Sequence, residues 1–257
     1  MERFLRIFYP LAVVLFFSGC SVLGTYNTAT GQREFIAIST PQEIAMGQGM
    51  HDNLLKEYHL SNQKDKLERV RRIGQRLAQI SDRQDYAYNF YIVEKKEQNA
   101  FTTPGGNIYI FTGLLGQLTT DDQIAAVLAH EIGHCAARHT VKKIQAAMGY
   151  SLVESIVFSS LGLQDQAKQI ASLSSDVVSN LVFSAYSRQD ELQADRLGVK
   201  YMYLAGYNLN GMIETLEILK KESKGNHVPE ILMTHPHLDA RIIAAKEEIQ
   251  KVRSQFK

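Results

Sequence analysis

Two histidines four residues apart, His130 and His134, place the strongest constraint on this chain, because Glu131 stands directly after the first of them. The segment before them carries apolar residues at helical spacing, namely Ile124, Val127 and Leu128. Residues four apart in a helix lie about 40° apart around its axis, so both imidazoles face the same point. The pattern H-E-x-x-H on a helix is typical of a zinc site whose glutamate contacts a water. The sequence therefore predicts a helix with two zinc ligands and a general base for peptide-bond hydrolysis.

The third protein ligand must come from elsewhere, because a catalytic zinc keeps three protein ligands and one open position. The metzincin class is excluded, since Ala137 and Thr140 stand where that class has a glycine and a histidine. Glu154 follows His134 in the sequence, but its neighbour one helical turn later is Phe158, which cannot orient a metal site.

A second candidate is Glu191, which lies one helical turn before Asp195 on a strongly helical segment. From that spacing, Glu191 can bind the metal while Asp195 accepts a proton from a ligand histidine. The other interpretation of these two carboxylates is a solvated acidic helix face. Because His130 and His134 need a third partner, the sequence favours Glu191 over Glu154, with one Zn²⁺ bound per chain.

The remaining hydrophobic periodicity predicts a mainly helical domain with one small sheet. Apolar residues recur at helical spacing over residues 40–59 and 64–81, and helical patterns continue from residue 119 nearly to the end. Residues 88–93 and 107–112 alternate in the period of a strand. We therefore expect an α+β fold in which a small antiparallel sheet flanks the active-site helix.

The formal net charge of the chain is only +1, without the excess of basic residues that nucleic-acid-binding domains carry. We therefore expect no nucleic-acid partner.

The first residues have the pattern of a secretion signal. Two arginines are followed by an apolar stretch over residues 7–17, which is too short to span a bilayer comfortably. The stretch ends in Phe17-Ser18-Gly19-Cys20, which resembles the lipobox of bacterial lipoproteins. This pattern predicts a signal peptide over residues 1–19 and a lipid on Cys20. The alternative is an uncleaved membrane anchor.

The stretch after Cys20 predicts how the domain is attached. Residues 20–39 are rich in small polar residues and predict a tether, and the folded domain is expected over residues 40–257. Ser21 after the cysteine resembles the sorting signal for the outer membrane of Gram-negative bacteria. We therefore expect a protein of the bacterial cell envelope, lipid-anchored at the periplasmic face of the outer membrane.

Four separated motifs resemble the family of zinc metallopeptidases that includes the CAAX prenyl protease, HtpX and BepA. They stand in the family's order: Asn99 to Ile108, His130 to His139, Ser187 to Asp195, and Thr234-His235-Pro236 with Arg241. The resemblance implies a gluzincin, zincin-like metallopeptidase domain in which Glu191 is the third zinc ligand. The soluble periplasmic lipoprotein members are the closer comparison, because the best candidate membrane span, residues 150–163, is too short.

The resemblance also implies roles for two further regions. The first is a substrate edge along which a peptide would bind as an added strand, either at residues 100–103 or at residues 108–111, with the turn at residues 104–106 beside the zinc. The residues of this edge are Ala100, Phe101, Gly105, Gly106, Asn107 and Ile108. The second is the C-terminal motif, where Pro236 favours an extended backbone at His235 and so places it in a loop. We expect His235, with Arg241, to act as a fourth ligand in a resting state or as a stabiliser of the transition-state oxyanion.

These features predict a zinc metalloendopeptidase in which Glu131 activates the water at the metal. The expected location and the resemblance suggest envelope quality control, with unfolded or misassembled envelope polypeptides as substrates and the N-terminal lipid as the membrane contact. The alternative is a periplasmic chaperone or assembly factor with a largely inactive zinc site. Glu131 discriminates between the two, because a structural zinc site does not need a base.

Overall fold

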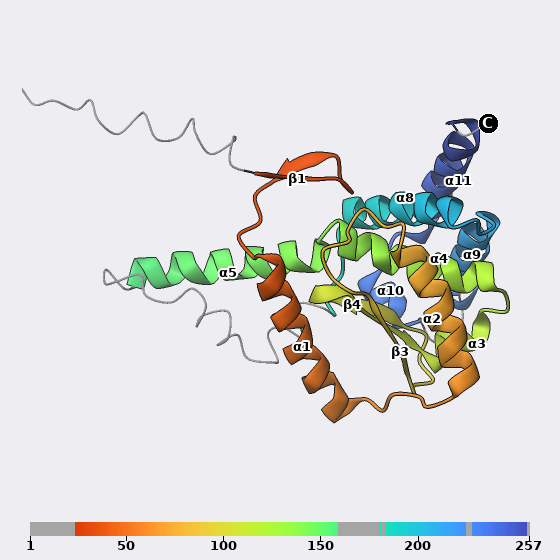
Figure 1. The fold of residues 1–257 in the computed structure, drawn as a ribbon, viewed down its shortest axis with the longest axis horizontal. Coiled ribbons are helices and arrows are strands. Elements are labelled where there is room, and N and C mark those ends of the chain that lie inside the picture. Colours follow the sequence, from red (N-terminus) through yellow and green to blue (C-terminus); the bar gives the residue numbers. More distant parts are fainter. Residues whose placement is uncertain (1–23, 159–179, 181–182, 225–227, 256–257) are drawn as a thin grey trace, which may run out of the picture.

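The computed structural model describes residues 24–158, 180, 183–224 and 228–255, with the backbone alone for residues 150–158, and it is mainly helical (Figure 1). The described elements are β1 Thr25–Asn27, β2 Gln32–Glu34, α1 Thr40–Glu57, α2 Lys64–Ala78, β3 Asn89–Val93, β4 Ala100–Thr103, η2 Pro104–Gly106, β5 Asn107–Phe111, α3 Thr112–Gln117, α4 Asp121–Ala136, α5 His139–Phe158, α8 Arg188–Leu204, α9 Asn210–Glu222, α10 Ile231–Thr234 and α11 Leu238–Gln255. The predicted α+β class is confirmed. Within these ranges, no helix combines the length and apolar character that crossing a membrane requires.

The three-stranded sheet has the order β3–β5–β4 and is mixed. In β5, Ile110 lies opposite Ala100 of the antiparallel strand β4 and opposite Ile92 of the parallel strand β3. This corrects the expected antiparallel sheet in one respect, the β3–β5 pair. The chain reverses direction between β3 and β4 and again at η2, so β5 runs in the direction of β3.

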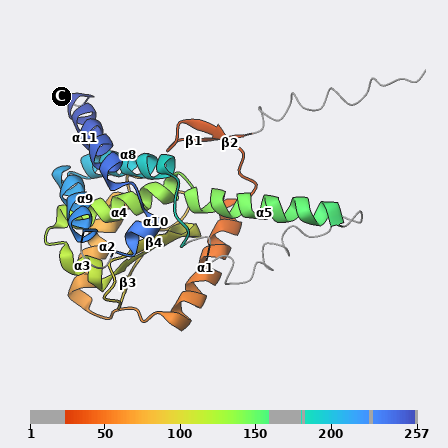
Figure 2. The same cartoon turned by 180° about the vertical axis from the view of Figure 1, so that it is seen from behind.

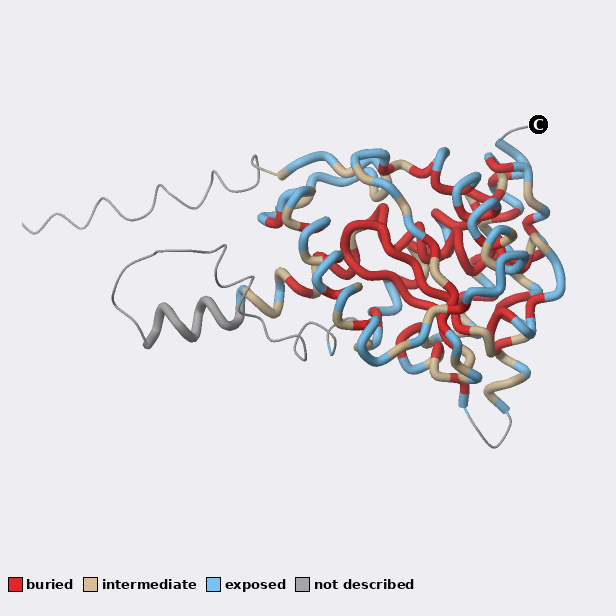
Figure 3. Tube along the Cα trace, turned by 60° about the horizontal axis from the view of Figure 1, so that its bottom comes forward, coloured by how far each residue is buried: buried red, intermediate tan, exposed pale blue. Residues whose placement is uncertain are grey.

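Helix α4 lies at the centre of the fold, in contact with α2, α8, α9 and the sheet. It begins after Thr120, whose side chain accepts a hydrogen bond from the backbone N–H of Gln123 and so caps the helix. Every residue of α4 from Gln123 to Ala136 is buried, and Figure 3 shows the buried interior as one continuous region. A helix that is buried all round must be covered on every side. Its polar side chains therefore lie in a poorly solvated interior.

Two glycines let α4 and α8 pack closely. A Cβ atom at Gly133 of α4 would lie 2.8 Å from the carbonyl oxygen of Ala194, and one at Gly198 of α8 would lie 3.3 Å from the backbone nitrogen of His130. A side chain at Gly133 would push the two helices apart, because packed interiors have no spare volume. This close approach allows the carboxylates of α8 to reach the histidines of α4.

The segment before α1 is a hairpin rather than only a tether. β1 and β2 pair antiparallel, and Asn27 donates a hydrogen bond to the carbonyl oxygen of Ala136 at the end of α4. Glu34 of β2 forms an ion pair with Lys142 of α5 at 2.6 Å. Residues 24–39 thus contact the domain that was expected to start at residue 40. The predicted signal peptide and Cys20 lie outside the described residues.

Helix α5 begins two residues after α4 and extends away from the rest of the fold (Figures 1 and 2). Its first two turns pack against α1 and one face of the sheet in a second apolar cluster, which includes Met50, Leu54, Tyr109, Val141 and Ile144. The other face of the sheet packs in the main core with α4 and α2. The start of α5 is therefore fixed in the domain next to the end of α4.

Candidate metal centre

Four side chains from three parts of the chain converge in one buried cluster. His130 and His134 come from adjacent turns of α4, Glu191 from the first turn of α8, and His235 directly follows α10. One ligand atom of each residue lies within 4.8 Å of the other three. His130 Nε2 lies 3.0 Å from His134 Nε2 and 3.2 Å from His235 Nδ1. Glu191 Oε1 lies 3.3 Å from His134 Nε2 and 3.0 Å from His235 Nδ1.

The donor set fits a zinc ion. Zinc ligands at about 2.0–2.2 Å in a tetrahedral arrangement lie roughly 3.3–3.6 Å from one another. The separations here include 3.0 Å between the two α4 histidines and 3.7 Å between His130 Nε2 and Glu191 Oε2, and the four ligand atoms all lie within 4.8 Å of one another. Both oxygens of the buried Glu131 and Nε2 of His235 have no hydrogen-bond partner among the described residues. Such atoms are costly to bury unpaired, and a cation with its water would satisfy them.

Arg241 of α11 joins the two carboxylates of α8. Its Nε and Nη2 donate to the two oxygens of Asp195 at 2.7 and 2.8 Å. Its Nη1 lies 2.6 Å from Glu191 Oε2 in an ion pair without hydrogen-bond geometry. Although burial opposes ionisation, Arg241 and His235 hold the pKa of Glu191 well below its usual range. Burial likewise opposes ionisation of Asp195, but Arg241 lowers the pKa of that group, so both carboxylates are ionised.

Asp195 also contacts a predicted zinc ligand. Its Oδ1 lies 2.8 Å from His130 Nδ1, and a carboxylate oxygen can only accept a hydrogen bond. His130 Nδ1 therefore carries the proton, which leaves Nε2 free to bind a metal. The i, i+4 spacing of Glu191 and Asp195 thus places one carboxylate in the cluster and the other behind it.

Glu131 lies beside the cluster with its carboxylate buried and without a hydrogen bond, and His235 Nε2 lies 3.6 Å from its Oε1. Burial raises the pKa of Glu131, which suits a carboxylate that takes a proton near neutral pH. A cavity of about 20 Å³ borders His130, Glu131, His235 and Arg241. That volume holds about one water molecule.

Two residues that the sequence did not assign to the site contact His134. Nδ1 of His139 lies 2.8 Å from Nδ1 of His134, and the ring of Tyr186 stacks on His134 with centroids 3.9 Å apart. The backbone N–H of Tyr186 donates to the carbonyl oxygen of Thr234, the residue before His235. His139 belongs to the zinc-helix motif, which gave it no role, and Tyr186 belongs to no motif. Their contacts depend on how separate elements pack.

The predicted substrate edge is only partly an edge. Strand β5 has a neighbour on each side, so the prediction that Ile108 lies on a free edge is wrong. Within the described residues β4 is the outer strand, and it carries Ala100 and Phe101, both buried. Asn107 begins β5 and donates to the carbonyl oxygen of Gly47 in α1. Of the two strands considered, β4 is the one with an unpaired side.

The turn between these strands packs against other parts of the domain. Gly105 and Gly106 have positive φ angles of 76° and 83°, which favour glycine. A Cβ atom at Gly105 would lie 2.9 Å from Ile44 Cα, and one at Gly106 would lie 2.6 Å from the ring of Tyr86. The turn thus packs closely against α1 and Tyr86, and it also contacts α4, the helix that carries His130 and His134.

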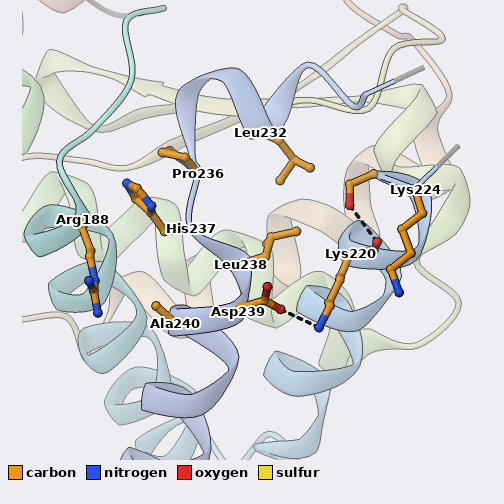
Figure 4. A pocket seen from close by; sticks show the side chains of 10 residues that line it. Arg188, Lys220, Lys224, Leu232, Pro236, His237, Leu238, Asp239 and Ala240 are labelled. Carbon is orange, nitrogen blue, oxygen red and sulfur yellow. Dashed lines mark hydrogen bonds and ion pairs between the residues drawn. The ribbon is translucent and has the colours of Figure 1, made fainter. Parts of the chain in front are cut away.

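A hollow of about 550 Å³ borders the loop that carries His235 (Figure 4). Its lining includes Pro236 and His237 together with Arg188, Lys220 and Lys224. Lys220 forms an ion pair with Asp239 beside it, as drawn in Figure 4. His235 is buried at 1% exposure, whereas the residues that follow it border open space.

Comparison with known proteins assigns the chain to a family. The sequence model of Peptidase family M48 matches residues 64–249, which contain all four residues of the cluster. The chain belongs to peptidase family M48. The M48 members are zinc metallopeptidases, and this result confirms the resemblance seen in the four motifs.

Two named groups of relatives match this M48 chain. The beta-barrel assembly-enhancing protease of Escherichia coli K12 is 25% identical over 228 residues, which cover 84% of this chain and 45% of that protein. The mitochondrial metalloendopeptidase OMA1 of Schizosaccharomyces pombe is 27% identical over 226 residues, covering 86% and 65%. OMA1 of Saccharomyces cerevisiae is 32% identical over 154 residues, covering 56% and 41%. The chain thus spans about half the length of the curated relatives it matches.

Proposed function

We propose that this chain is a zinc-dependent endopeptidase of the gluzincin type, with His130, His134 and Glu191 as ligands and Glu131 as the base. The observation that carries the proposal is the buried cluster, whose four ligand atoms lie within 4.8 Å of one another beside a buried glutamate that makes no hydrogen bond. Membership in family M48 and relatives named as proteases support it.

The residues around the cluster have distinct tasks in this mechanism. Zinc, when bound, supplies a Lewis acid that polarises the scissile carbonyl and acidifies a water. Glu131 takes the proton of that water, since its oxygens accept no hydrogen bond from the described residues and burial raises its pKa. Glu131 then gives this proton to the leaving amine nitrogen. Asp195 orients the ring of His130 through Nδ1.

For His235, the geometry supports a fourth ligand in a resting state. Its Nδ1 lies 3.2 Å from His130 Nε2 and 3.0 Å from Glu191 Oε1, which is ligand spacing. The hollow beside Pro236 leaves space next to the loop, so His235 can withdraw when a substrate enters. His235→Ala should then raise proteolysis, whereas loss of an oxyanion stabiliser would cost about 10²-fold or more in turnover.

Arg241 donates to the carbonyl oxygen of His235 at 3.4 Å, and it has a second task at the carboxylates of α8. Both sides of its guanidinium are engaged by Asp195 and Glu191, so it is a counter-ion for the two buried carboxylates. A donor that is already paired in this way is poorly placed to stabilise an oxyanion. We assign Arg241 to holding the carboxylates of α8 in their ionised form.

The location and the substrates follow from the N-terminus and the relatives. The lipobox-like Phe17-Ser18-Gly19-Cys20 supports a lipid-anchored protein of the bacterial cell envelope, at the periplasmic face of the outer membrane. Bacterial relatives of this chain carry names that refer to β-barrel assembly. We therefore propose unfolded or misassembled envelope polypeptides as substrates. An assembly factor with an inactive zinc site is the second candidate, because the four-ligand cluster resembles a filled structural site.

Glu131→Gln tests the mechanism and separates the two candidates. Glutamine preserves the shape of the side chain but cannot take a proton, so zinc content should stay at one per chain while casein cleavage falls by about 10²-fold or more. Glu217→Gln, on the exposed side of α9, is the control and should cleave as the wild type does. A zinc-loaded Glu131→Gln protein with full activity would rule out this mechanism, and a wild type without zinc-dependent cleavage would favour the assembly factor.

A further inference from the structure

His139 lies against a zinc ligand because of the way α4 ends. In one continuous helix, residues five apart differ by roughly 140° around the axis, so His134 and His139 would face different directions. Here α4 ends at Ala136, Arg138 has a positive φ of 58°, and α5 begins at His139. The break turns the His139 ring back, so that its Nδ1 lies 2.8 Å from His134 Nδ1.

The break is held by contacts from the N-terminal part of the domain. A left-handed backbone conformation costs a residue such as Arg138 on the order of 1–2 kcal/mol. Arg138 Nη2 donates to the carbonyl oxygen of Ile38 at 2.6 Å and pairs with Glu43 at 2.9 Å. Glu43 is 2% exposed and also pairs with Arg83 at 2.7 Å. These bonds offset the strain and fix the position of His139.

The contacts of His139 Nε2 determine which ring nitrogens of His139 and His134 carry protons. His139 Nε2 lies 2.9 Å from Gln193 Oε1 and 3.4 Å from a carboxylate oxygen of Asp190. Both oxygens can only accept, so His139 Nε2 carries a proton. Nδ1 of the neutral His139 ring is then an acceptor, and the proton between the two histidines belongs to His134 Nδ1. His134 Nε2 is left with a bare lone pair.

The two histidines of α4 thus reach the same state by different routes. His130 Nδ1 donates to Asp195, and its Nε2 also carries a bare lone pair. The two Nε2 atoms lie 3.0 Å apart, where two lone pairs repel unless a cation lies between them. The contacts behind both rings therefore prepare the same two atoms for a metal ion.

We propose that His139 is a positioning residue that fixes the tautomer and ring orientation of His134 without placing a charged group behind it. Its ring is buried at 2% exposure and is held from the other side by Gln193 of α8, the helix that carries Glu191. The inference rests on the metal centre of the proposed function but not on cleavage. It holds for a zinc site that is inactive as well as for an active one.

Three substitutions of His139 in the full-length chain distinguish the contact of its Nδ1 with His134 from the contact of its Nε2 with Gln193. His139→Leu removes the acceptor for His134 and should weaken zinc binding by about 10–100-fold, the range for lost outer partners of metal ligands. His139→Asn places an amide oxygen near the former Nδ1 and should restore zinc affinity to within a few-fold of the wild type. His139→Gln reaches towards Gln193 but leaves His134 Nδ1 unpaired, so it should resemble the leucine variant. Zinc affinity is measured by competition with a chromophoric chelator.

A histidine elsewhere provides the control. His51 bonds to Tyr109 at 2.8 Å on another face of the domain, so His51→Leu should lower the melting temperature without changing zinc affinity. ¹⁵N-histidine spectra should show His134 protonated at Nδ1, with and without zinc, and this signal should be lost in His139→Leu. Wild-type zinc affinity in folded His139→Leu, or equal affinities in all three variants, would overturn the proposal. A wild type that binds no zinc would refute the proposed function, and the spectra would still decide the role of His139.

Discussion

The two sides of the metal cluster orient its histidines in contrasting ways. Behind His130 lies an ion pair, in which Asp195 is bound on both oxygens by Arg241. Behind His134 lies the uncharged ring of His139. In both arrangements the outer partner accepts a hydrogen bond from the protonated Nδ1, and Nε2 carries no proton. If both histidines bind the metal as proposed, the site requires a given tautomer and ring direction, while the charge of the outer partner can differ.

Charge balance explains why only His130 has a carboxylate in direct contact with its ring, whereas Asp190 lies beyond His139, 3.4 Å from its Nε2. The buried groups at the cluster include three carboxylates, Glu131, Glu191 and Asp195, and one guanidinium, Arg241. If all three carboxylates are ionised, two negative charges remain, which a divalent cation neutralises. A further buried carboxylate behind His134 would need its own counter-ion, because unpaired buried charges are strongly unfavourable. A neutral histidine avoids this requirement.

The largest effect on zinc affinity is expected at Glu191, which lies near both His130 and His134. Glu191→Ala removes a metal ligand, so zinc affinity should fall by more than the roughly 100-fold upper range for outer partners. Zinc per chain after dialysis measures this effect. Glu154→Ala, at the other candidate ligand of the sequence, should keep its zinc. Equal zinc content in the two variants would reject Glu191 as the third ligand.

The next prediction compares the loss of stability when the outer partner of His130 or that of His134 is removed. Asp195→Leu leaves the buried Arg241 without its bidentate partner, so the zinc-free protein should lose about 3 kcal/mol or more of unfolding free energy. His139→Leu leaves one neutral donor unpaired and should cost about 1–3 kcal/mol. Urea denaturation in the presence of a chelator compares the two. Asp195→Asn keeps an oxygen that accepts from Arg241 and should lose less than Asp195→Leu, and an equal loss in the two variants would contradict the ion-pair explanation.

A smaller effect is expected from moving α8 away from both histidines at once. Gly133→Ala forces a Cβ to within 2.8 Å of the Ala194 carbonyl oxygen, which should cost about 1–3 kcal/mol. Zinc affinity should fall as well, because Glu191 and Gln193 both belong to α8. Gly49→Ala in α1 meets nothing within 4 Å and should stabilise the protein by up to about 1 kcal/mol. Unchanged zinc affinity in Gly133→Ala would show that the helix spacing does not position the ligands.

The smallest effect on zinc affinity is expected when Gln193, the residue that accepts from His139, is replaced by a charged glutamate. Gln193→Glu retains an oxygen that accepts from His139 Nε2, so zinc affinity should stay within about tenfold of the wild type. Gln193→Met removes this acceptor and should weaken zinc binding more. Isothermal titration with zinc distinguishes the two variants. If the glutamate variant binds zinc as weakly as the methionine variant, the absence of charge on this side is itself required.

Local spacing explains what was predictable. His130, Glu131 and His134 lie on one helix, and Glu191 and Asp195 lie one turn apart on another, so helical geometry relates them without knowledge of the fold. Hydrophobic periodicity likewise predicted the mainly helical class. The sheet was less predictable, because the direction of β5 relative to β3 depends on two chain reversals rather than on the composition of either strand.

The sequence by itself determined which residues can bind a metal and which carboxylate lies beside which, because those relations are fixed within single helices. Only the tertiary structure decided that β5 is central, that Arg241 pairs with both carboxylates of α8, and that His139 lies behind His134. The contact between His139 and His134 depends on Arg138 leaving the helical conformation. Its bonds to Ile38 and Glu43 offset the strain of that conformation. These two residues lie about 95 to 100 positions before Arg138. Contacts between residues so far apart in the chain leave no periodic pattern in the sequence.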